Sequence, residues 1–373
     1  MTILSADQLI SALTAGNFYR SDYNKLNSSG AQVVGQWYDL AQGTGNPACN
    51  AVIGSSANLA HQAISETTTT TATTAALSGN FATTVFTDTT HSTGRFTVGM
   101  LLTGSGVPAG TYIVSLGTGT GANNGGTYNL SNTPGTISNV TVTGTAGTSG
   151  IPHGGNVSTA VKNLLNANVY SGAASTAPNI FMLYDLIATY TITSTTTTGA
   201  QSLTGQTAWP RYASGVGVRA ILTPTIVMGV GTPTVQLSYT NPASVSGQLT
   251  PTAPSLPIIN TTSPVGSIMY AGTGVGKFGP FIPLAAGDTG IKSVESINFS
   301  ATMTSGVCVL SIVKPICTIP LTTAGVAGER DLVNQIPSMP VIPDGACLNW
   351  MMYAGVATPA VTPFFGNLDF AWG

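Results

Sequence analysis

The chain has 373 residues, of which 42% are hydrophobic and 6% are charged, with 10 basic and 12 acidic side chains. Ordinary soluble proteins carry about a quarter charged residues, so this composition excludes both a charge-rich disordered chain and a protein that packs directly against nucleic acid. A lone monomer with so little charge would be repelled only weakly by its neighbours. We therefore expect much of the surface to be buried in an assembly.

The first predicted element is a short helix over about residues 5–14. Ser5 and Gln8 have the spacing of a capping box, and Gly16 would end the helix. This amino-terminal stretch lacks the basic and small-residue pattern of a signal peptide. No apolar run approaches the roughly 18 residues that cross a bilayer, so no membrane contact is expected.

The segment after the helix, FYRSDYNKL, holds the densest charge in the chain. Its Arg20, Asp22, Tyr23 and Lys25 are candidates for contacts with a partner, because a charged and aromatic arm is suited to docking. The alternative is a solvated loop that covers the core. Residues 33–40 follow and are predicted to form a strand.

A threonine-rich tract at residues 66–78 opens an insert of different composition, at about 67–150. Short apolar runs alternate there with Gly, Asn and Pro turns, and the Asn-Gly-Gly sequence at 124–126 is a strong hairpin signal. The insert is therefore predicted to be a small β domain. Its Tyr112 and Tyr128 are candidates for an exposed platform that binds a sugar.

The insert separates an amino-terminal arm with the start of the core, residues 1–66, from the main part of the core, residues 151–373. The apolar side chains of residues 157–165 keep the spacing i, i+4, i+7, i+8. This spacing predicts a short amphipathic helix at the point where the core resumes.

The rest of the chain is predicted to be β structure. The run at residues 347–353 is apolar on both parities, as in a strand covered on both sides. The run at residues 362–373 places its large apolar side chains on one parity and Asn367 and Asp369 on the other. Further strands are predicted at residues 181–192, 218–230, 235–239, 266–270, 291–303 and 307–313. About eight spaced strands with long Pro-rich crossovers predict an all-β fold with a jelly-roll-like β-sandwich core.

No group of residues has the spacing of a catalytic or metal site. The stretch GTGVGKFG at residues 272–279 lacks the Ser or Thr that follows Lys in a phosphate loop. Glu329, Arg330 and Asp331 form a tight charge cluster, but neither a histidine nor a cleft signal accompanies the two carboxylates. A subunit contact through Arg330 and a plain solvated loop both remain open. We therefore expect no enzyme activity, no cofactor and no metal.

The histidines and cysteines have no metal-ligand spacing either. His153 precedes two glycines, and we expect a backbone group at a domain joint to satisfy it. The cysteines form no CxxC pair, which favours buried thiols, and one disulfide between two of the three carboxyl-terminal cysteines is the alternative. The four cysteines are Cys49, Cys308, Cys317 and Cys347.

Two parts of the chain resemble proteins of tailed bacteriophages. The pattern FTVGMLLTGSGVPAGTYIVS followed by GTYNLS is similar to a small β module that recurs in phage virion proteins, and the match covers residues 80–142. The core, residues 15–60 plus 150–373, resembles an uncharacterised structural-protein family of tailed phages. The motifs that carry this second resemblance are FYRSDYNKL, GQWYDL, IPHGGNV, FGPFIPLAAGDTGIKSV, CTIPLTTAGVAGERDLVNQIPSMP and DGACLNWMMYAG with FGNLDFAWG.

The resemblances imply a structural protein of a tailed-phage virion, at the capsid surface and assembled in the host cytoplasm. The preferred role is a decoration or cement protein that contacts the major capsid protein or other virion proteins, as a homotrimer by family habit. One alternative is the major capsid protein itself, although no long spine helix and no charged scaffold segment are present. Another is a tail or receptor-binding protein whose insert binds carbohydrate.

Overall fold

We describe the protein from a computed structural model. The description covers residues 3, 5–27, 31–42, 45–46, 58–59, 74–82, 84–91, 100–108, 111, 113–117, 126–130, 132, 134–146, 150–154, 157, 159–173, 176–192, 198–203, 209, 211–226, 229, 233–251, 265–268, 280–335 and 339–373.

The described part of the chain is almost entirely β structure, preceded by one short helix, α1 (Ala6–Thr14). The Ser5 hydroxyl accepts a hydrogen bond from the Gln8 amide at 3.3 Å, which is the predicted amino-terminal cap. The helix buries Leu9 and Ala12 against the core. Among the described residues, no helix is long and apolar enough to span a membrane.

The strands outside the insert form three antiparallel sheets. The five-stranded sheet has the order β19 (Gly328–Asp331), β11 (Lys162–Val169), β21 (Pro363–Trp372), β1 (Phe18–Leu26) and β3 (Gly45–Asn46). The second sheet has the order β14 (Arg219–Ile226), β18 (Val307–Leu321), β12 (Asn179–Thr191), β20 (Leu348–Ala354) and β2 (Trp37–Asp39), with β4 (Asn58–Leu59) paired to β12. The third has the order β13 (Gly199–Ser202), β17 (Ser293–Phe299), β15 (Val235–Thr240) and β16 (Gln248–Leu249).

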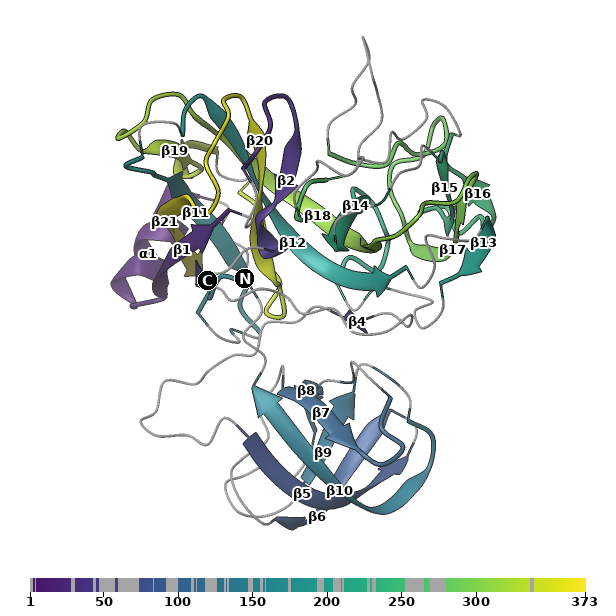
Figure 1. Ribbon diagram of the computed structural model, residues 1–373. Coiled ribbons are helices and arrows are strands. Elements are labelled where there is room, and N and C mark those ends of the chain that lie inside the picture. Colours follow the sequence, from purple (N-terminus) through teal and green to yellow (C-terminus); the bar gives the residue numbers. More distant parts are fainter. Residues whose placement is uncertain are drawn as a thin grey trace.

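Two hydrophobic cores lie along the same two long strands, β12 and β18, which cross the molecule in Figure 1. The first core fills the space between the five-stranded sheet and the second sheet, with Phe181 and Ile319 from the long strands and Phe364 from β21. The second core lies between the other part of the long strands and the four-stranded sheet, and includes Tyr190 and Leu310. The predicted all-β, jelly-roll-like sandwich with a short amino-terminal helix is therefore confirmed as a fold class.

The insert forms a six-stranded sheet of its own, which lies apart from the other sheets in Figure 1. Its order is β7 (Met100–Gly104), β10 (Ile137–Ala146), β5 (Thr74–Ala82), β6 (Val85–His91), β9 (Gly126–Leu130) and β8 (Ile113–Leu116). A separate small core that includes Phe86, Ile113 and Val142 packs within it. The exact division of the chain into domains stays a prediction.

Two predictions of local structure were wrong. Residues 157–165 do not form a helix, because residues 162–169 are strand β11, which pairs with β21 on one side and β19 on the other. A bulge between Leu164 and Asn166 lets both Leu164 and Leu165 point inward, so the apolar spacing imitates a helical face.

The second concerns FYRSDYNKL, which is not a solvated loop but strand β1, and this strand pairs with β21 along its whole length.

Other boundaries differ by a few residues. The strand predicted at residues 33–40 is limited to β2, and a short 3-10 helix, η1 (Leu40–Gln42), follows it. A second 3-10 helix, η2 (Val333–Gln335), follows β19. The two closing strands, β20 and β21, exist as predicted but lie in different sheets, on opposite sides of the first core.

Candidate interaction surface on the five-stranded sheet

The side of the five-stranded sheet that faces away from the first core carries a regular array of polar residues, which we call the outer face. Strand alternation creates it: Ser21, Tyr23 and Lys25 of β1 point inward and are buried, whereas Arg20 and Asp22 are exposed. The outer face consists of Phe18, Arg20, Asp22 and Asn24 of β1, Phe365, Asn367 and Asp369 of β21, Asn166, Asn168 and Tyr170 in and after β11, and Glu329 and Asp331 of β19.

Residues from four strands form two rows across this face. In the first row, Arg20 lies opposite Asp369, Asp369 opposite Asn166, and Asn166 opposite Asp331. The second row contains Asp22 and Asn367 as one opposed pair. Asn168 and Glu329 form the other. Directly opposed side chains are close enough to interact, so the register itself assembles the array.

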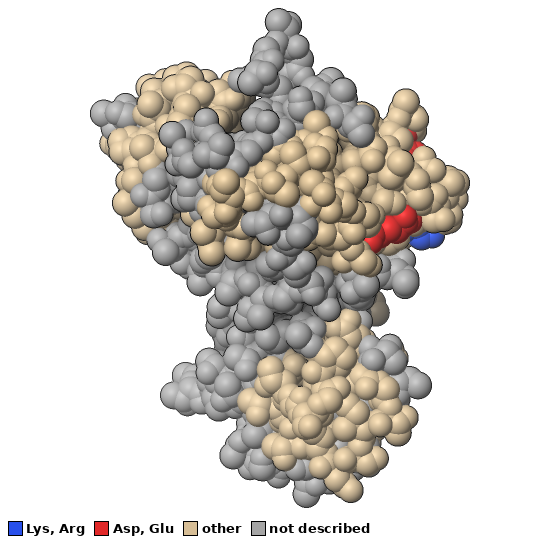
Figure 2. All heavy atoms as spheres, turned by 45° about the vertical axis from the view of Figure 1, so that its right-hand side comes forward, with Lys and Arg blue, Asp and Glu red and all other residues tan. Residues whose placement is uncertain are grey.

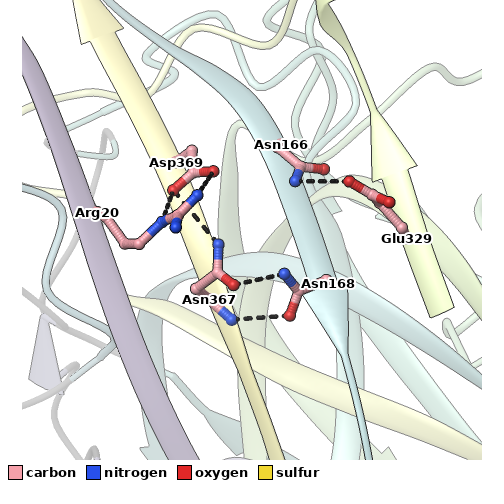
Figure 3. A network of polar contacts seen from close by, with 6 residues as sticks. All are labelled: Arg20, Asn166, Asn168, Glu329, Asn367 and Asp369. Carbon is pink, nitrogen blue, oxygen red and sulfur yellow. Dashed lines mark hydrogen bonds and ion pairs between the residues drawn. The ribbon is translucent and has the colours of Figure 1, made fainter. Parts of the chain in front are cut away.

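An ion pair fixes one end of the first row. The Arg20 Nε and Nη2 atoms each donate to one carboxylate oxygen of Asp369 at 2.7 Å, in the bidentate geometry visible in Figure 3. The Arg20 side chain is 56% exposed, whereas that of Asp369 is 8% exposed. The hydrogen bonds that Arg20 donates to Asp369 raise the pKa of Arg20, and the attraction between the two opposite charges raises it further. Bidentate pairs of this kind hold both groups in a defined orientation.

Amide side chains continue the network across the sheet. The Asn367 side chain donates to Asp369 at 3.3 Å, and its backbone N–H donates to Asn168 Oδ1 at 3.0 Å. Asn168 Nδ2 in turn donates to Asn367 Oδ1, and Asn166 Nδ2 donates to Glu329 Oε1 at 2.9 Å (Figure 3). These contacts bring together residues from both ends of the chain and hold the polar groups in place before any partner arrives.

An aromatic pair borders the array. Tyr170 and Phe365 exchange backbone hydrogen bonds, and their rings lie 6.3 Å apart with an interplanar angle of 39°. The Tyr170 residue is 37% exposed, and Phe18 at the far end of β1 is 41% exposed. Aromatic side chains beside ordered polar groups are the kind of residue that anchors protein interfaces.

The seven residues predicted from sequence to contact a partner separate into two groups. Arg20, Asp22, Glu329 and Asp331 share the outer face, although the sequence places them more than 300 residues apart. The other three, Tyr23, Lys25 and Arg330, do not lie on this face.

Tyr23 and Lys25 are unsuited to a surface contact because the inward parity of β1 buries them. Burial raises the pKa of Tyr23 well above its ordinary value, and its hydroxyl donates to the Asn168 carbonyl at 2.6 Å. Arg330 points to the opposite side of β19, close enough to Cys317 for its charge to act on that thiol.

Four residues that complete the array were not predicted from the sequence as candidates for a partner contact. Asn367 and Asp369 gave a signal, since both fall on the polar parity of the last run. Asn166 and Asn168 gave none, because they directly follow residues 157–165, which were interpreted as a helix.

The insert provides no support for a sugar platform at Tyr128. This residue is almost fully buried in the core of the insert, where its ring stacks on Phe86 at 6.0 Å. Tyr112 lies outside the described residues. The prediction of an exposed tyrosine pair is therefore wrong for Tyr128, because Tyr128 lies on the side of β9 that faces the interior of the insert.

Outside the outer face, the remaining candidates have structural surroundings. Cys308, Cys317 and Cys347 are free thiols, so the alternative of a disulfide between two of them is wrong. No group of three or more His, Cys, Asp or Glu side chains that could hold a metal ion occurs in the described part of the chain. Cys49 and the stretch at residues 272–279 lie outside that part.

His153 is fully buried and contacts a backbone carbonyl, as predicted. Its Nε2 atom lies 2.9 Å from the Ala346 oxygen. Its Nδ1 atom lies 3.0 Å from Lys162 Nζ, a contact that the sequence did not indicate.

A scan against protein-family models gives no match, and a search of curated proteins gives none either. Among solved structures, the chain is similar to the VP2 subviral particle of infectious bursal disease virus, with 10% identity over 84% of this chain and 83% of that chain and a TM-score of 0.16. The Gt strain of the same virus gives 10% identity, coverage of 84% of each chain and a TM-score of 0.12. TM-scores this low carry no argument about fold or function.

Proposed function

We propose that this chain is a structural component of a tailed-phage virion, a decoration or cement protein that bridges neighbouring capsid subunits on the outside of the head. The proposed role is structural and involves no catalysis. The proposal rests on the resemblance of the insert and core motifs to tailed-phage virion proteins and on the character of the described surface. A homotrimer is the proposed state of assembly.

The observation that carries the proposal is the distribution of charge. Several of the few charged side chains are buried inside the protein. They include both members of the Asp185–Arg211 ion pair. Lys162 is buried as well, and its partner Asp344 is partly exposed. Figure 2 shows one face on which nearly every described residue is uncharged. Such a surface has few ions to desolvate, so a large area of it can be buried in an assembly at low cost.

The outer face is the proposed docking surface. Four of its side chains, Arg20, Asp369, Asn367 and Asn168, are already joined to one another by hydrogen bonds. A partner therefore meets groups that have already lost their rotational freedom, which reduces the entropic cost of binding. Asp22, Glu329 and Asp331 add negative charge at the rim of the face, where charge guides orientation and speeds association.

Charge reversal on the outer face tests the proposal. Asp22→Lys combined with Glu329→Lys is expected to weaken binding to phage heads assembled without the protein by at least tenfold, as measured by co-sedimentation. Ser246→Lys is the matched control, because Ser246 is exposed in the loop between β15 and β16 of another sheet. Equal binding by the double variant, the control and the unchanged protein would remove the outer face from the proposal.

Imaging of purified particles with a tagged insert distinguishes the proposed role from its alternatives. Regular label over the head lattice supports a decoration protein. Label at the tail alone would replace it with a tail or receptor-binding protein. Failure of the shell to form without this chain would replace it with a major capsid protein.

A further inference from the structure

A buried polar cluster joins the chain that returns from the insert to the segment before strand β20. The Ile151 amide donates to the Leu348 carbonyl at 2.7 Å, and the Val157 amide donates to Asp344 Oδ1 at 3.1 Å. Between these two contacts, His153 reaches the Ala346 carbonyl. Residues 150–154 and Val157 are thus held against residues 344–348 at three points, and the imidazole is the central one.

The contacts define the protonation of His153. A carbonyl oxygen only accepts hydrogen bonds, so the Nε2 atom of His153 must carry a proton and donate it to Ala346. The Nδ1 atom is then the acceptor, and the Lys162 Nζ at 3.0 Å is its donor. Both side chains are almost completely excluded from solvent. The imidazole is therefore neutral in the folded protein.

The charged groups around the imidazole come from four segments: strand β11, strand β12, the segment before β14 and the segment before β20. Lys162 of β11 faces Nδ1, and its ammonium also lies 3.3 Å from Asp344, whose side chain is 27% exposed. Behind Cys347, the Cys347 amide donates to the Asp185 carboxylate at 2.8 Å, and Asp185 is paired with the buried Arg211. From β21, the ring of Phe370 approaches the imidazole at 6.1 Å and contributes no charge. Tyr19 of β1 packs beside Gly154.

We propose that His153 and Lys162 form an acid-sensitive latch that holds residues 150–154 and Val157 on the core and releases them when His153 takes up a second proton. A proton on Nδ1 would point directly at the Lys162 ammonium, placing two positive charges about 3 Å apart in a site closed to water. The cluster tolerates even one charge poorly, since burial lowers the pKa of Lys162 despite the neighbouring Asp344.

The sign of the pH dependence follows from the neutral folded imidazole. A released His153 binds a proton with an ordinary pKa of about 6.5, whereas the latched His153 does not. The latch is therefore fully closed above that pH, and its opening constant rises by about tenfold for each pH unit below it. This range lies above the pH at which ordinary carboxylates are protonated, so the two effects separate.

Hydrogen exchange followed by mass spectrometry on the isolated protein tests the latch. Between about pH 6.5 and pH 5, the protection factors of peptides that contain Ile151 and Val157 are expected to fall by roughly tenfold per pH unit, after correction for intrinsic exchange. In His153→Gln, whose amide can donate to Ala346 and accept from Lys162 but does not titrate, protection is expected to stay constant. His91→Gln is the control and should behave like the unchanged protein. Equal slopes in His153→Gln and the unchanged protein would overturn the proposal.

A second measurement does not depend on the folding of a variant at the latch. In His61→Gln/His91→Gln, His153 is the sole histidine, and its imidazole signal can be followed by NMR as the pH is lowered. We expect the neutral signal to persist until protection at Ile151 is lost. Ordinary titration near pH 6.5 with that protection intact would overturn the latch. Neither test depends on the proposed role in a virion.

Discussion

The buried ion pair between Asp185 and Arg211 offers the most direct test of how this core is held together. Asp185 lies on β12, and Arg211 lies in the segment before β14. Arg211 Nε and Nη2 donate to the two Asp185 oxygens at 2.8 and 2.7 Å, and Nη2 also donates to the Leu186 carbonyl at 2.7 Å. The Cys347 amide donates to the same carboxylate at 2.8 Å. One buried carboxylate thus links three segments.

The substitution Arg211→Met keeps most of the side-chain volume and removes the charge. It leaves Asp185, which is 0% exposed, with two uncharged donors, the Cys347 amide and the Tyr212 hydroxyl. A buried carboxylate that loses a bidentate charged partner is uncompensated, and breaking such a pair costs about 3–5 kcal/mol. We therefore expect the free energy of unfolding to fall by about that amount.

Urea unfolding followed by tryptophan fluorescence measures the effect, because Trp350 is buried in the first core and Trp209 in the second. The control is Arg20→Met, which removes the same group from a pair that is half exposed and should cost about 1 kcal/mol or less. The double variant Asp185→Leu/Arg211→Met should recover most of the loss, since no charge is left unpaired. A loss below about 1 kcal/mol in Arg211→Met, or no recovery in the double variant, would refute the reasoning.

Two further predictions concern the thiols and the insert. Burial raises the pKa of Cys317 to about 12, so this thiol should react with a disulfide reagent at pH 8 only after the protein is unfolded, and reaction at the rate of a free cysteine would contradict that assignment. Tyr128→Ala removes a ring from the core of the insert and should destabilise the insert by about 3–5 kcal/mol, as judged from proteolysis within residues 74–146, whereas an exposed platform residue would leave proteolysis unchanged.

The alternation of apolar and polar residues was sufficient to predict the strands but not their partners. In β21, the parity that was predicted to face inward is buried at Phe364, Leu368 and Phe370. Nothing in the pattern indicates that β20 and β21 belong to different sheets, because period-2 patterning is the same whichever strand lies alongside. Pairing is decided by contacts between segments hundreds of residues apart.

The helix predicted at residues 157–165 shows where the period itself misleads. A bulge in β11 turns two consecutive leucines, Leu164 and Leu165, toward the interior. Two adjacent apolar residues are normal on a helical face and unusual in a regular strand, so the pattern favoured a helix. The error also hid Asn166 and Asn168, which complete the network on the outer face.

Charged residues were harder to interpret than apolar ones. A lysine within a charged segment is expected at the surface, yet Lys25 is buried because it has the inward parity of β1. By the same rule Arg20 and Asp22 point outward, and the register with β21 places Arg20 opposite Asp369. Once FYRSDYNKL is known to be a strand, its parity separates the docking candidates from the core residues without further information.

The few charged residues of this chain are not spread evenly over its surface. Ion pairs join segments that are distant in sequence: Lys162 with Asp344, and Arg20 with Asp369. Each pair holds a strand or a returning chain in position, and it keeps the Lys162 ammonium and the Asp369 carboxylate off the surface. Among the charged groups that remain exposed, Asp22, Glu329 and Asp331 share one ordered sheet face, and charge on such a face favours orientation on a partner. Under the proposed role in a virion, we therefore expect the outer face, and not the insert, to make the contact with the capsid.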